Sequence, residues 1–449
     1  MDGKGGARGL AGRMWGEAKE PLYRNAIFMM ASSVIGTGLG FFFWVIVYQV
    51  YDPSDAGYGV TLTSTIAFLA GVATLGLGIG LIRFLPEAGE PASLINSSLS
   101  ISGLVGLALA FVFVLGAGIW APELDFIQNP LYVAAILVTG MAYAFAPILD
   151  SAAIGLRRAE LATWRNTAFS LIKIPLPLVF VLAFSGPLGG RMGVYLSIAV
   201  AFGVSVVLMG VAFLPWSLPG YRPRPRLSRR LVRPIFAFSV GNWIAAIVGS
   251  AGILLLPFLI LRTLGQAGAD DAGYFYAAYT VAGLLYVIPG ATMTSLLAES
   301  SQQGAQRRQD ERKAILLSLG LLAPGIAAMW VLARFILELF VSGTAESEIV
   351  ERAVTPLRIL AFAAIPAFLN GLLGTRLRIQ KRVVPLIASA AVGTAVTLGA
   401  GYVLLLSMGL DGLAIAFVVG QVAAAPILWA TARSPVDAAP IELVPTPPT

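Results

Sequence analysis

The 449-residue chain contains no cysteine and no histidine. Without cysteine it can form no disulfide and present no thiolate, although this absence does not identify a cellular compartment. Without histidine it lacks the commonest metal ligand and the side chain that most readily exchanges protons near neutral pH. We therefore predict no metal site, no cofactor and no catalytic residue, and we expect any titrating group to be a carboxylate.

Charge is also scarce in this sequence. Only 12% of the residues are charged and 57% are hydrophobic, with a mean hydropathy of +0.83, whereas soluble domains carry about a quarter charged residues. Long uncharged runs approach or exceed the roughly 20 apolar residues that a helix needs to cross a bilayer, and membrane strands would be shorter and would alternate. The sequence predicts an all-α membrane protein with twelve transmembrane helices, in the runs 25–50, 56–82, 91–122, 126–149, 166–190, 192–221, 234–261, 272–298, 314–333, 359–375, 383–410 and 412–432.

The distribution of Lys and Arg predicts the orientation of these helices. If both termini face the cytoplasm, the inner segments hold 24 of the 30 basic residues and the outer loops hold four. Short cytoplasmic loops carry such an excess, so we predict a multi-pass protein of the plasma membrane with cytoplasmic N- and C-termini. Topology and contacts with lipid headgroups then explain the net charge of +7, and we predict the bilayer, but no nucleic acid, as a partner.

Two pairs of matching segments indicate an internal duplication. Residues 54–58 (Ser-Asp-Ala-Gly-Tyr) are echoed 216 positions later by residues 270–274 (Asp-Asp-Ala-Gly-Tyr). The segments Pro147–Arg157 and Pro366–Arg376 share a proline, a glycine and an arginine at the same separations, with an offset of 219. Because six spans return the chain to the side where it began, we predict two parallel six-helix repeats.

The duplication and the composition predict five segments. The prolines and arginines of the central segment indicate a basic cytoplasmic linker, and the proline-rich end of the chain indicates disorder. The segments are a cytoplasmic N-terminal tail at 1–23, a first six-helix bundle at 24–215, the linker at 216–233, a second six-helix bundle at 234–432 and a disordered cytoplasmic tail at 433–449.

Two stretches support a family resemblance. They are Tyr51-Asp-Pro-Ser-Asp-Ala-Gly-Tyr58, in the first outer loop, and the glycine-rich Leu75-Gly-Leu-Gly-Ile-Gly-Leu-Ile-Arg83-Phe-Leu-Pro, at the inner end of span 2. With its twelve spans in two halves, the chain resembles, over about residues 20–430, the polysaccharide (oligosaccharide-lipid) flippases of the multidrug/oligosaccharidyl-lipid/polysaccharide (MOP) exporter superfamily. Peptidoglycan-precursor flippases of this superfamily usually have fourteen spans, so twelve spans favour the polysaccharide branch.

The resemblance implies a V-shaped pair of bundles around a central cavity. It also implies a function: moving a polyprenyl-pyrophosphate-linked oligosaccharide from the inner to the outer leaflet by alternating access, for cell-surface polysaccharide biosynthesis such as O-antigen export. The implied partners are this lipid-linked glycan and the glycan polymerase or ligase machinery. The candidate driving forces are a proton gradient, a sodium gradient and the membrane potential.

Three basic residues are candidates for holding the pyrophosphate. They are Arg24 at the mouth of span 1, Arg83 at the inner end of span 2 and Lys173 within span 5. Arginine forms fork-like contacts with phosphate oxygens, but Arg24 and Arg83 also fit ordinary snorkelling toward headgroups. A charge within a span costs roughly 2.5–3.5 kcal/mol, so Lys173 is expected to face either the cavity or a partner such as Asp150.

Polar side chains within the spans supply further candidates. Asn25, Asn242 and Asn370 either line a glycan path or cross-link helices through their amide groups. Asp150 is the candidate residue for coupling to an ion or a proton, because carboxylates are the available titrating groups in a chain without histidine.

The sequence also bears on three other functional classes. A cation-coupled small-molecule or multidrug antiporter of the same superfamily is the main alternative, and its activity should follow an ion gradient. A major-facilitator transporter normally has an acidic-then-basic sequence between spans 2 and 3, which residues 83–91 do not match. A membrane glycan polymerase or ligase needs a large outer loop, whereas the longest one here is about residues 342–355, so we predict that the chain is not an enzyme.

Overall fold

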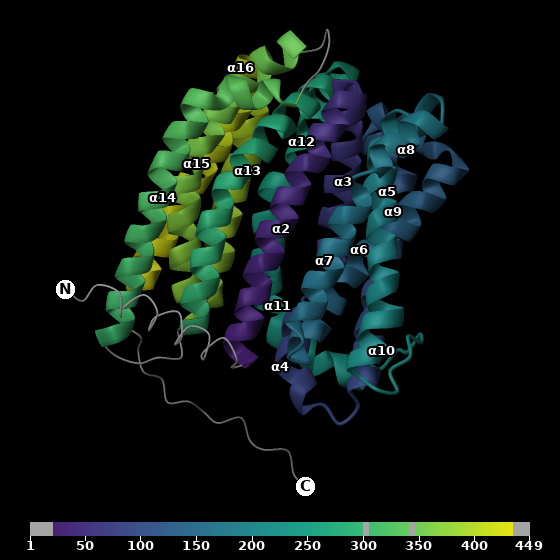
Figure 1. Ribbon diagram of the computed structural model, residues 1–449, viewed down its shortest axis with the longest axis vertical. Helices are drawn as coiled ribbons and strands as arrows, with labels where there is room; N and C mark the ends of the chain where they lie inside the picture. Colours follow the sequence, from purple (N-terminus) through teal and green to yellow (C-terminus); the bar gives the residue numbers. More distant parts are fainter. Residues whose placement is uncertain (1–20, 300–304, 341–345, 434–449) are drawn as a thin grey trace, which may run out of the picture.

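The computed structural model describes residues 21–299, 305–340 and 346–433, and within these ranges all regular elements are helices (Figure 1). The predicted tails at 1–23 and 433–449 therefore lie almost entirely outside the described residues. The first half contains α2 (Pro21–Val50), α3 (Pro53–Ala73), α4 (Leu77–Phe84), α5 (Pro91–Trp120), α6 (Pro130–Gly155), α7 (Ala159–Lys173), α8 (Leu176–Ala183), α9 (Arg191–Leu208) and α10 (Leu214–Ser217). The second half contains α11 (Arg229–Leu254), α12 (Leu256–Leu264), α13 (Gly268–Glu299), α14 (Ala305–Glu338), α15 (Glu346–Ile379) and α16 (Val383–Arg433).

These helices account for the twelve predicted spans. Ten stretches of the described residues are helical, long and apolar enough to cross a membrane. One of them, α16, contains two spans, because Gly409 has a φ of 63° in the left-handed region and breaks the 51-residue helix into a hairpin. The 32-residue helix α13 supplies the remaining span. The prediction of an all-α membrane protein with twelve helices is confirmed.

Several spans are interrupted where the sequence disfavours a continuous helix. Between α3 and α4, Leu75 and Gly76 both have positive φ angles of 49° and 69°. α7 and α8 are separated next to Pro175, whose ring cannot continue a helix without losing a hydrogen bond. Each interruption lies within one predicted span, so these short helices are segments of the same transmembrane crossing.

The linker between the halves is shorter than predicted. Its prolines all precede residue 226, so nothing prevents α11 from starting at Arg229, and residues 229–233 are helical. The non-helical part packs on the first bundle. Asn96 Nδ2 of α5 donates to the carbonyl oxygen of Arg222 at 2.9 Å, and the backbone nitrogen of Arg226 donates to Ser100 Oγ at 3.0 Å.

Large apolar side chains on the outside of the bundles identify the lipid-facing surface. Ile119 of α5 is 79% exposed and Leu182 of α8 is 82% exposed. In water such side chains would form an unfavourable apolar surface, whereas in a bilayer they contact hydrocarbon. With the apolar helices, they make the chain a multi-pass membrane protein.

The helices form two bundles, which Figure 1 shows with α14, α15 and α16 on one side, α5 to α10 on the other and α2 between them. The largest cluster of buried apolar residues includes both halves of the chain, for example Trp44 and Val60 with Leu256 and Phe275. The rings of Trp44 and Tyr276 lie 4.8 Å apart across this boundary. The bundles thus share a hydrophobic core.

The repeated sequence brings the two halves together. At the start of α3, a Cβ added to Gly57 would collide with the carbonyl oxygen of Ala269 and lie 3.0 Å from the nitrogen of Gly273. At the start of α13, a Cβ added to Gly273 would collide with the carbonyl oxygen of Pro53 and lie 3.5 Å from the nitrogen of Gly57. We call this contact the glycine crossing.

The glycine crossing is reciprocal, because Pro53 and Ala269 are separated by the same 216 positions as Gly57 and Gly273. Such a contact, in which each partner uses the same surface, is the signature of a twofold relation. α3 and α13 both begin at this end of the molecule, so the two repeats are parallel, as predicted. Tyr48 Oη strengthens the contact by donating to the carbonyl oxygen of Gly273 at 2.7 Å.

A second contact joins the bundles toward the other end of α3. Trp243 Nε1 of α11 donates to the carbonyl oxygen of Gly71 at 3.2 Å. Further along, Gly80 of α4 packs directly on Ile235, and the rings of Phe84 and Phe238 lie 5.5 Å apart. The span formed by α3 and α4 therefore contacts the second bundle through both of its segments.

Adding one methyl group at the glycine crossing should destabilise the protein. We expect Gly57→Ala and Gly273→Ala to cost about 1–3 kcal/mol each, because the obstacle is backbone that cannot rotate away. Gly203→Ala in α9 is the control: a Cβ there meets nothing within 4 Å, and replacing a helical glycine normally stabilises by about 0.5–1 kcal/mol. Thermal unfolding of the detergent-solubilised variants measures the difference, and equal midpoints for Gly57→Ala and Gly203→Ala would contradict the close packing.

Candidate functional site

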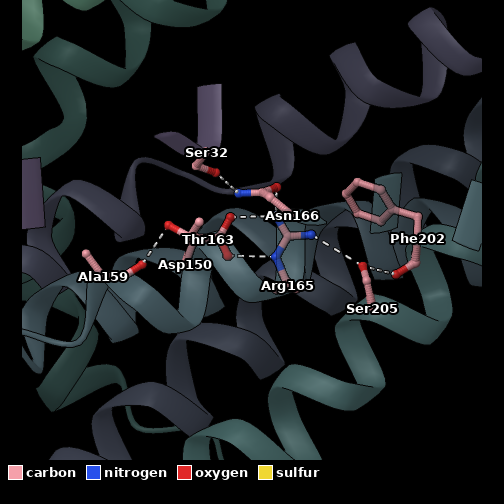
Figure 2. A network of polar contacts seen from close by, with 8 residues as sticks. All are labelled: Ser32, Asp150, Ala159, Thr163, Arg165, Asn166, Phe202 and Ser205. Carbon is pink, nitrogen blue, oxygen red and sulfur yellow. Dashed lines mark hydrogen bonds and ion pairs between the residues drawn. The ribbon is translucent and has the colours of Figure 1, made fainter. Parts of the chain in front are cut away.

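A buried ion pair lies inside the first bundle (Figure 2). Arg165 of α7 donates from Nη2 to Asp150 Oδ2 at 2.6 Å and from Nε to Asp150 Oδ1 at 2.7 Å. The side chain of Arg165 is 4% exposed and that of Asp150 is 22% exposed. Two parallel hydrogen bonds of this kind hold both groups in a fixed geometry.

The ion pair is the centre of a wider polar network. Arg165 Nη2 also donates to Asn166 Oδ1 at 2.7 Å, and its Nη1 lies 3.4 Å from Ser205 Oγ of α9. Asn166 Nδ2 in turn donates to Ser32 Oγ of α2 at 3.1 Å. The network therefore ties α2, α6, α7 and α9 together within the bundle, as Figure 2 shows.

Asp150, the candidate for ion coupling, is paired with Arg165 and not with Lys173. The predicted span 166–190 begins after Arg165, whereas α7 begins at Ala159 and contains Arg165 in its second turn. A buried arginine with a carboxylate partner does not need to end a transmembrane helix.

Lys173 is enclosed by aromatic rings. It is 8% exposed, and its Nζ lies 5.1 Å from the ring centre of Phe43 and 4.7 Å from that of Phe169. A lysine ammonium over an aromatic face is stabilised by the charge distribution of the ring. The group also approaches α2, since a Cβ added to Gly40 would lie 3.7 Å from Nζ. Lys173 is thus held between α2 and α7 by cation–π contacts.

The other predicted residues of the first bundle are more peripheral. Arg83, at the end of α4, is 56% exposed and forms an ion pair with Glu87 at 2.6 Å. Arg24 and Asn25 belong to the first turns of α2, but their side chains lie outside the described residues. The structure therefore does not bring Arg83 and Lys173 into one phosphate-binding cluster.

The second bundle contains a cavity of about 440 Å³. It lies between α11, α13, α15 and α16, and its wall includes Asn370, as well as Tyr279, Tyr286, Arg378 and Gln421. Asn242 is half-buried on α11, one turn before the lining residue Ala245, and does not line the cavity itself. Of the predicted polar residues whose side chains the structure describes, Asn370 lies on the wall of this cavity.

The lining of this cavity, which we call the C-bundle pocket, is mostly apolar, and its polar groups are not acidic. Asn370 Nδ2 donates to the backbone oxygen of Gln421 at 2.7 Å and to its Oε1 at 3.2 Å. Tyr286 Oη donates to the carbonyl oxygen of Leu360 at 2.9 Å. The pocket wall contains amides, hydroxyls and one guanidinium, and neither Asp nor Glu is among these described lining residues.

A smaller cavity of about 190 Å³ lies between the two bundles. Trp44, Thr63 and Ser64 line it from the first bundle, and Tyr276 and Tyr279 line it from the second. Tyr279 therefore forms part of the wall of both cavities. It lies where the resemblance implies a central cavity, and its lining is mostly apolar and rich in aromatic rings.

Sequence reasoning missed Arg378, Gln421, Tyr279 and Tyr286. Arg378 was counted as a basic residue of an inner loop, and the two tyrosines were unremarkable within a span. One signal was present: Tyr279 and Tyr286 are seven residues apart, a spacing that places them on the same face of a helix.

The sequence of this chain matches one protein family. The family model described as polysaccharide biosynthesis protein matches residues 22–298, which is more than half of the chain. No curated protein matches the sequence.

Solved structures share the fold. The lipid II flippase MurJ, in an inward closed conformation, is similar with a TM-score of 0.68 and 14% identity, over 91% of this chain and 87% of that chain. A multidrug resistance MATE family transporter of the MOP superfamily, in an inward-facing conformation, has a TM-score of 0.65 and 15% identity, over 91% and 94%. A MOP superfamily transporter from Pyrococcus furiosus is similar with a TM-score of 0.64 and 15% identity, over 93% of this chain and 96% of that chain. At these identities the similarity is one of fold, and it confirms the predicted architecture.

Breaking the buried ion pair should cost far more stability than breaking the exposed one. We expect Asp150→Asn to lower the free energy of unfolding by about 3–5 kcal/mol, because it leaves the Arg165 guanidinium buried without a counter-charge. Arg83→Gln, which removes the exposed pair with Glu87, should cost about 0–1 kcal/mol. Denaturant unfolding of the solubilised variants, followed by circular dichroism, compares them. Equal losses in the two variants would show that the network does not hold the first bundle together.

Proposed function

Because the chain belongs to the polysaccharide biosynthesis protein family, we propose that it is a flippase for a lipid-linked saccharide. Its cargo is a polyprenyl-pyrophosphate-linked oligosaccharide, which it turns from the inner to the outer leaflet for the assembly of a cell-surface polysaccharide such as O-antigen. The work is transport, and no residue of the chain is assigned a catalytic role. The similarity in fold to transporters of the MOP superfamily and to a flippase supports this class of function.

The observation that carries the proposal is the glycine crossing. It joins the two repeats by reciprocal backbone contacts at the shared start of α3 and α13, while the other contacts between the bundles are made by side chains. Two rigid bodies joined in this way can move relative to each other, as alternating access requires. The cavity between the bundles lies among the helices that this motion would rearrange.

The basic loops support the orientation and the location. The end of α4, the linker that follows α10 and the start of α11 carry arginines on one side of the molecule, opposite the glycine crossing. By the excess of positive charge on cytoplasmic loops, this side faces the cytoplasm and the glycine crossing faces outward. We place the protein in the plasma membrane with both termini cytoplasmic, beside the polymerase or ligase that would use its product.

Among the predicted phosphate contacts, Lys173 has the most suitable position. Its ammonium is buried next to α2, and aromatic rings, rather than a carboxylate, stabilise it. Such a cation keeps its charge available for an anionic ligand. Arg24 and Arg83 then act at the cytoplasmic mouth, and Asn25 and Asn242 provide amide groups along the path. Asp150 is the candidate for coupling to a proton or sodium gradient through its pair with Arg165, and the membrane potential is the third candidate driving force.

The antiporter alternative lacks a corresponding observation. A transporter for organic cations is expected to offer carboxylates to its cargo. Among the described lining residues of the C-bundle pocket and of the cavity between the bundles, the charged residue is Arg378, and Asp150 is already paired with Arg165. The electrostatics therefore favour a cargo that is neutral or anionic.

Removing the buried ammonium should slow transport without removing the protein from the membrane. In vesicles loaded with lipid-linked oligosaccharide, we expect Lys173→Ala to reduce the rate at which the glycan becomes accessible in the opposite leaflet by about tenfold or more, as for the loss of one charge-assisted contact. Lys173→Arg, which keeps the charge, should retain most of the rate. If the double variant Lys173→Ala, Arg83→Ala transports at the normal rate and abundance, the phosphate assignment is wrong.

Closing the outer end permanently should stop transport. Because the chain has no cysteine, a pair introduced as Ser54→Cys and Asp270→Cys, on the two sides of the glycine crossing, can be joined selectively by a short bifunctional maleimide. We expect the joined protein to lose transport and each single-cysteine variant to keep it after the same treatment. Transport that continues in the joined protein would show that the crossing does not open.

A further inference from the structure

The two repeats share a fold but differ in what fills their interiors. The turns that end α6 and α15 match, because Arg157 and Lys381 both have positive φ angles, of 58° and 57°. Counted from these turns, with an offset of 224, Asp150 corresponds to Gly374 and Arg165 corresponds to Ser389, so the second bundle has no ion pair at the equivalent positions. Gly374 and Ser389 both line the C-bundle pocket, together with Asn370. The second bundle therefore has a cavity with room for a ligand where the first bundle has a structural ion pair.

We propose that the C-bundle pocket binds the saccharide portion of the transported lipid, with Arg378 contacting an anionic group of the same molecule. The assignment rests on the proposed function and adds a separate subsite within one bundle, distinct from the cavity between the bundles. It names Asn370, Gln421 and Tyr286 as residues that meet the sugar.

The pocket has the size of a small-molecule site. Its volume of about 440 Å³ falls within the roughly 300–1,000 Å³ that is typical of such sites. Glycines create part of this room. A Cβ added to Gly249 would meet only Ala390, at 3.8 Å, and one added to Gly374 would meet Leu386 at 3.5 Å. Side chains would fit at these positions, so close helix packing does not require glycine there, and larger residues would fill the pocket.

The hydrogen-bonding groups match a saccharide. Asn370 Oδ1 is buried and accepts no hydrogen bond from the described residues, although its Nδ2 is bonded twice to Gln421. A buried acceptor without a donor is unfavourable, and a sugar hydroxyl is a suitable donor. Tyr279 and Tyr286 add two aromatic rings to the same wall, with their centres 6.3 Å apart. Amides, hydroxyls and ring faces together suit a ligand with many hydroxyl groups and an apolar ring face.

The charge of the lining excludes a cation and favours an anionic end. Asp and Glu are missing from the described lining, and the guanidinium of Arg378 lies over the pocket wall, with Nη1 3.9 Å from a Cβ position on Gly374. No ion pair within the described part of the chain occupies this guanidinium. Arginine is well shaped for the oxygens of a phosphate or a carboxylate. Its ligand is therefore the pyrophosphate of the carrier or an acidic sugar.

A single reporter thiol can test binding directly. Ala390→Cys introduces the sole cysteine of the chain into the pocket, and Gly89→Cys places it in an exposed loop, where a Cβ meets nothing within 4 Å. The probe is the lipid-linked saccharide fraction extracted from cells of the source organism that lack this gene, added to the full-length protein in nanodiscs. We expect the fraction to slow N-ethylmaleimide labelling of Ala390→Cys by about tenfold at saturation, and to leave Gly89→Cys unchanged.

The fraction is also used after mild acid has hydrolysed the bond between the saccharide and the pyrophosphate, which releases the saccharide without phosphate. If Arg378→Gln weakens the protection by the intact lipid but not the protection by the free saccharide, Arg378 contacts the carrier pyrophosphate. If Arg378→Gln weakens the protection by free saccharide by about tenfold, Arg378 contacts an acidic sugar. If only the intact lipid, and not the free saccharide, protects Ala390→Cys, the saccharide assignment of the pocket is overturned.

Filling the pocket provides an independent test. Gly249→Leu should abolish the protection and impair transport. The matched control Gly399→Leu on α16 should do neither, because a Cβ there meets nothing within 4 Å and Gly399 does not line the pocket. If the wild-type protein and Gly249→Leu transport the extract equally well, the pocket does not bind the saccharide, but the proposal of a flippase stands. Wild-type protein that neither binds nor transports the extract refutes the flippase itself.

Discussion

The contact on which the arrangement of the molecule depends is the glycine crossing between α3 and α13. Each helix places a backbone carbonyl where any side chain of the other would stand, so Gly57 and Gly273 are required in both repeats. In lipid the hydrophobic effect does not drive helices together, and close backbone packing at small residues takes its place. The shared aromatic core around Trp44 and Tyr276 then surrounds this contact.

The same duplication produced two bundles with different interiors. The first bundle buries charge, and each buried cation has a compensating partner: Arg165 has the carboxylate of Asp150, and Lys173 has the rings of Phe43 and Phe169. The second bundle leaves a cavity lined by Asn370 and by the guanidinium of Arg378. A bundle fixed by an ion pair is suited to move as a rigid body, and a bundle with a lined cavity is suited to hold part of a cargo. This difference between the two bundles depends on the few positions that carry the ion pair in one bundle and line the cavity in the other.

These buried charges also show where reasoning from composition loses accuracy. Treating spans as uncharged runs located the helices well, because an unpaired charge in lipid is costly. It failed at Arg165, which a carboxylate one helix away compensates, so α7 begins seven residues before the predicted span. The start of α11 differs from the prediction for a related reason. The arginines at 229 and 230 suggested a loop, but they follow the prolines of the linker and form a regular first helical turn.

What the sequence determined by itself was the solvent, the number of spans and the parallel duplication. These depend on hydropathy and on offsets along the chain, which need no knowledge of contacts. The tertiary structure decided which polar groups meet. Asp150 pairs with Arg165 and not with Lys173, and Gly57 packs on the chain around Gly273. It also decided that Asn370 shares a cavity with Gln421 and Arg378. Such pairings join residues on different helices, and the rotation of each helix about its axis is set by packing that no single span contains.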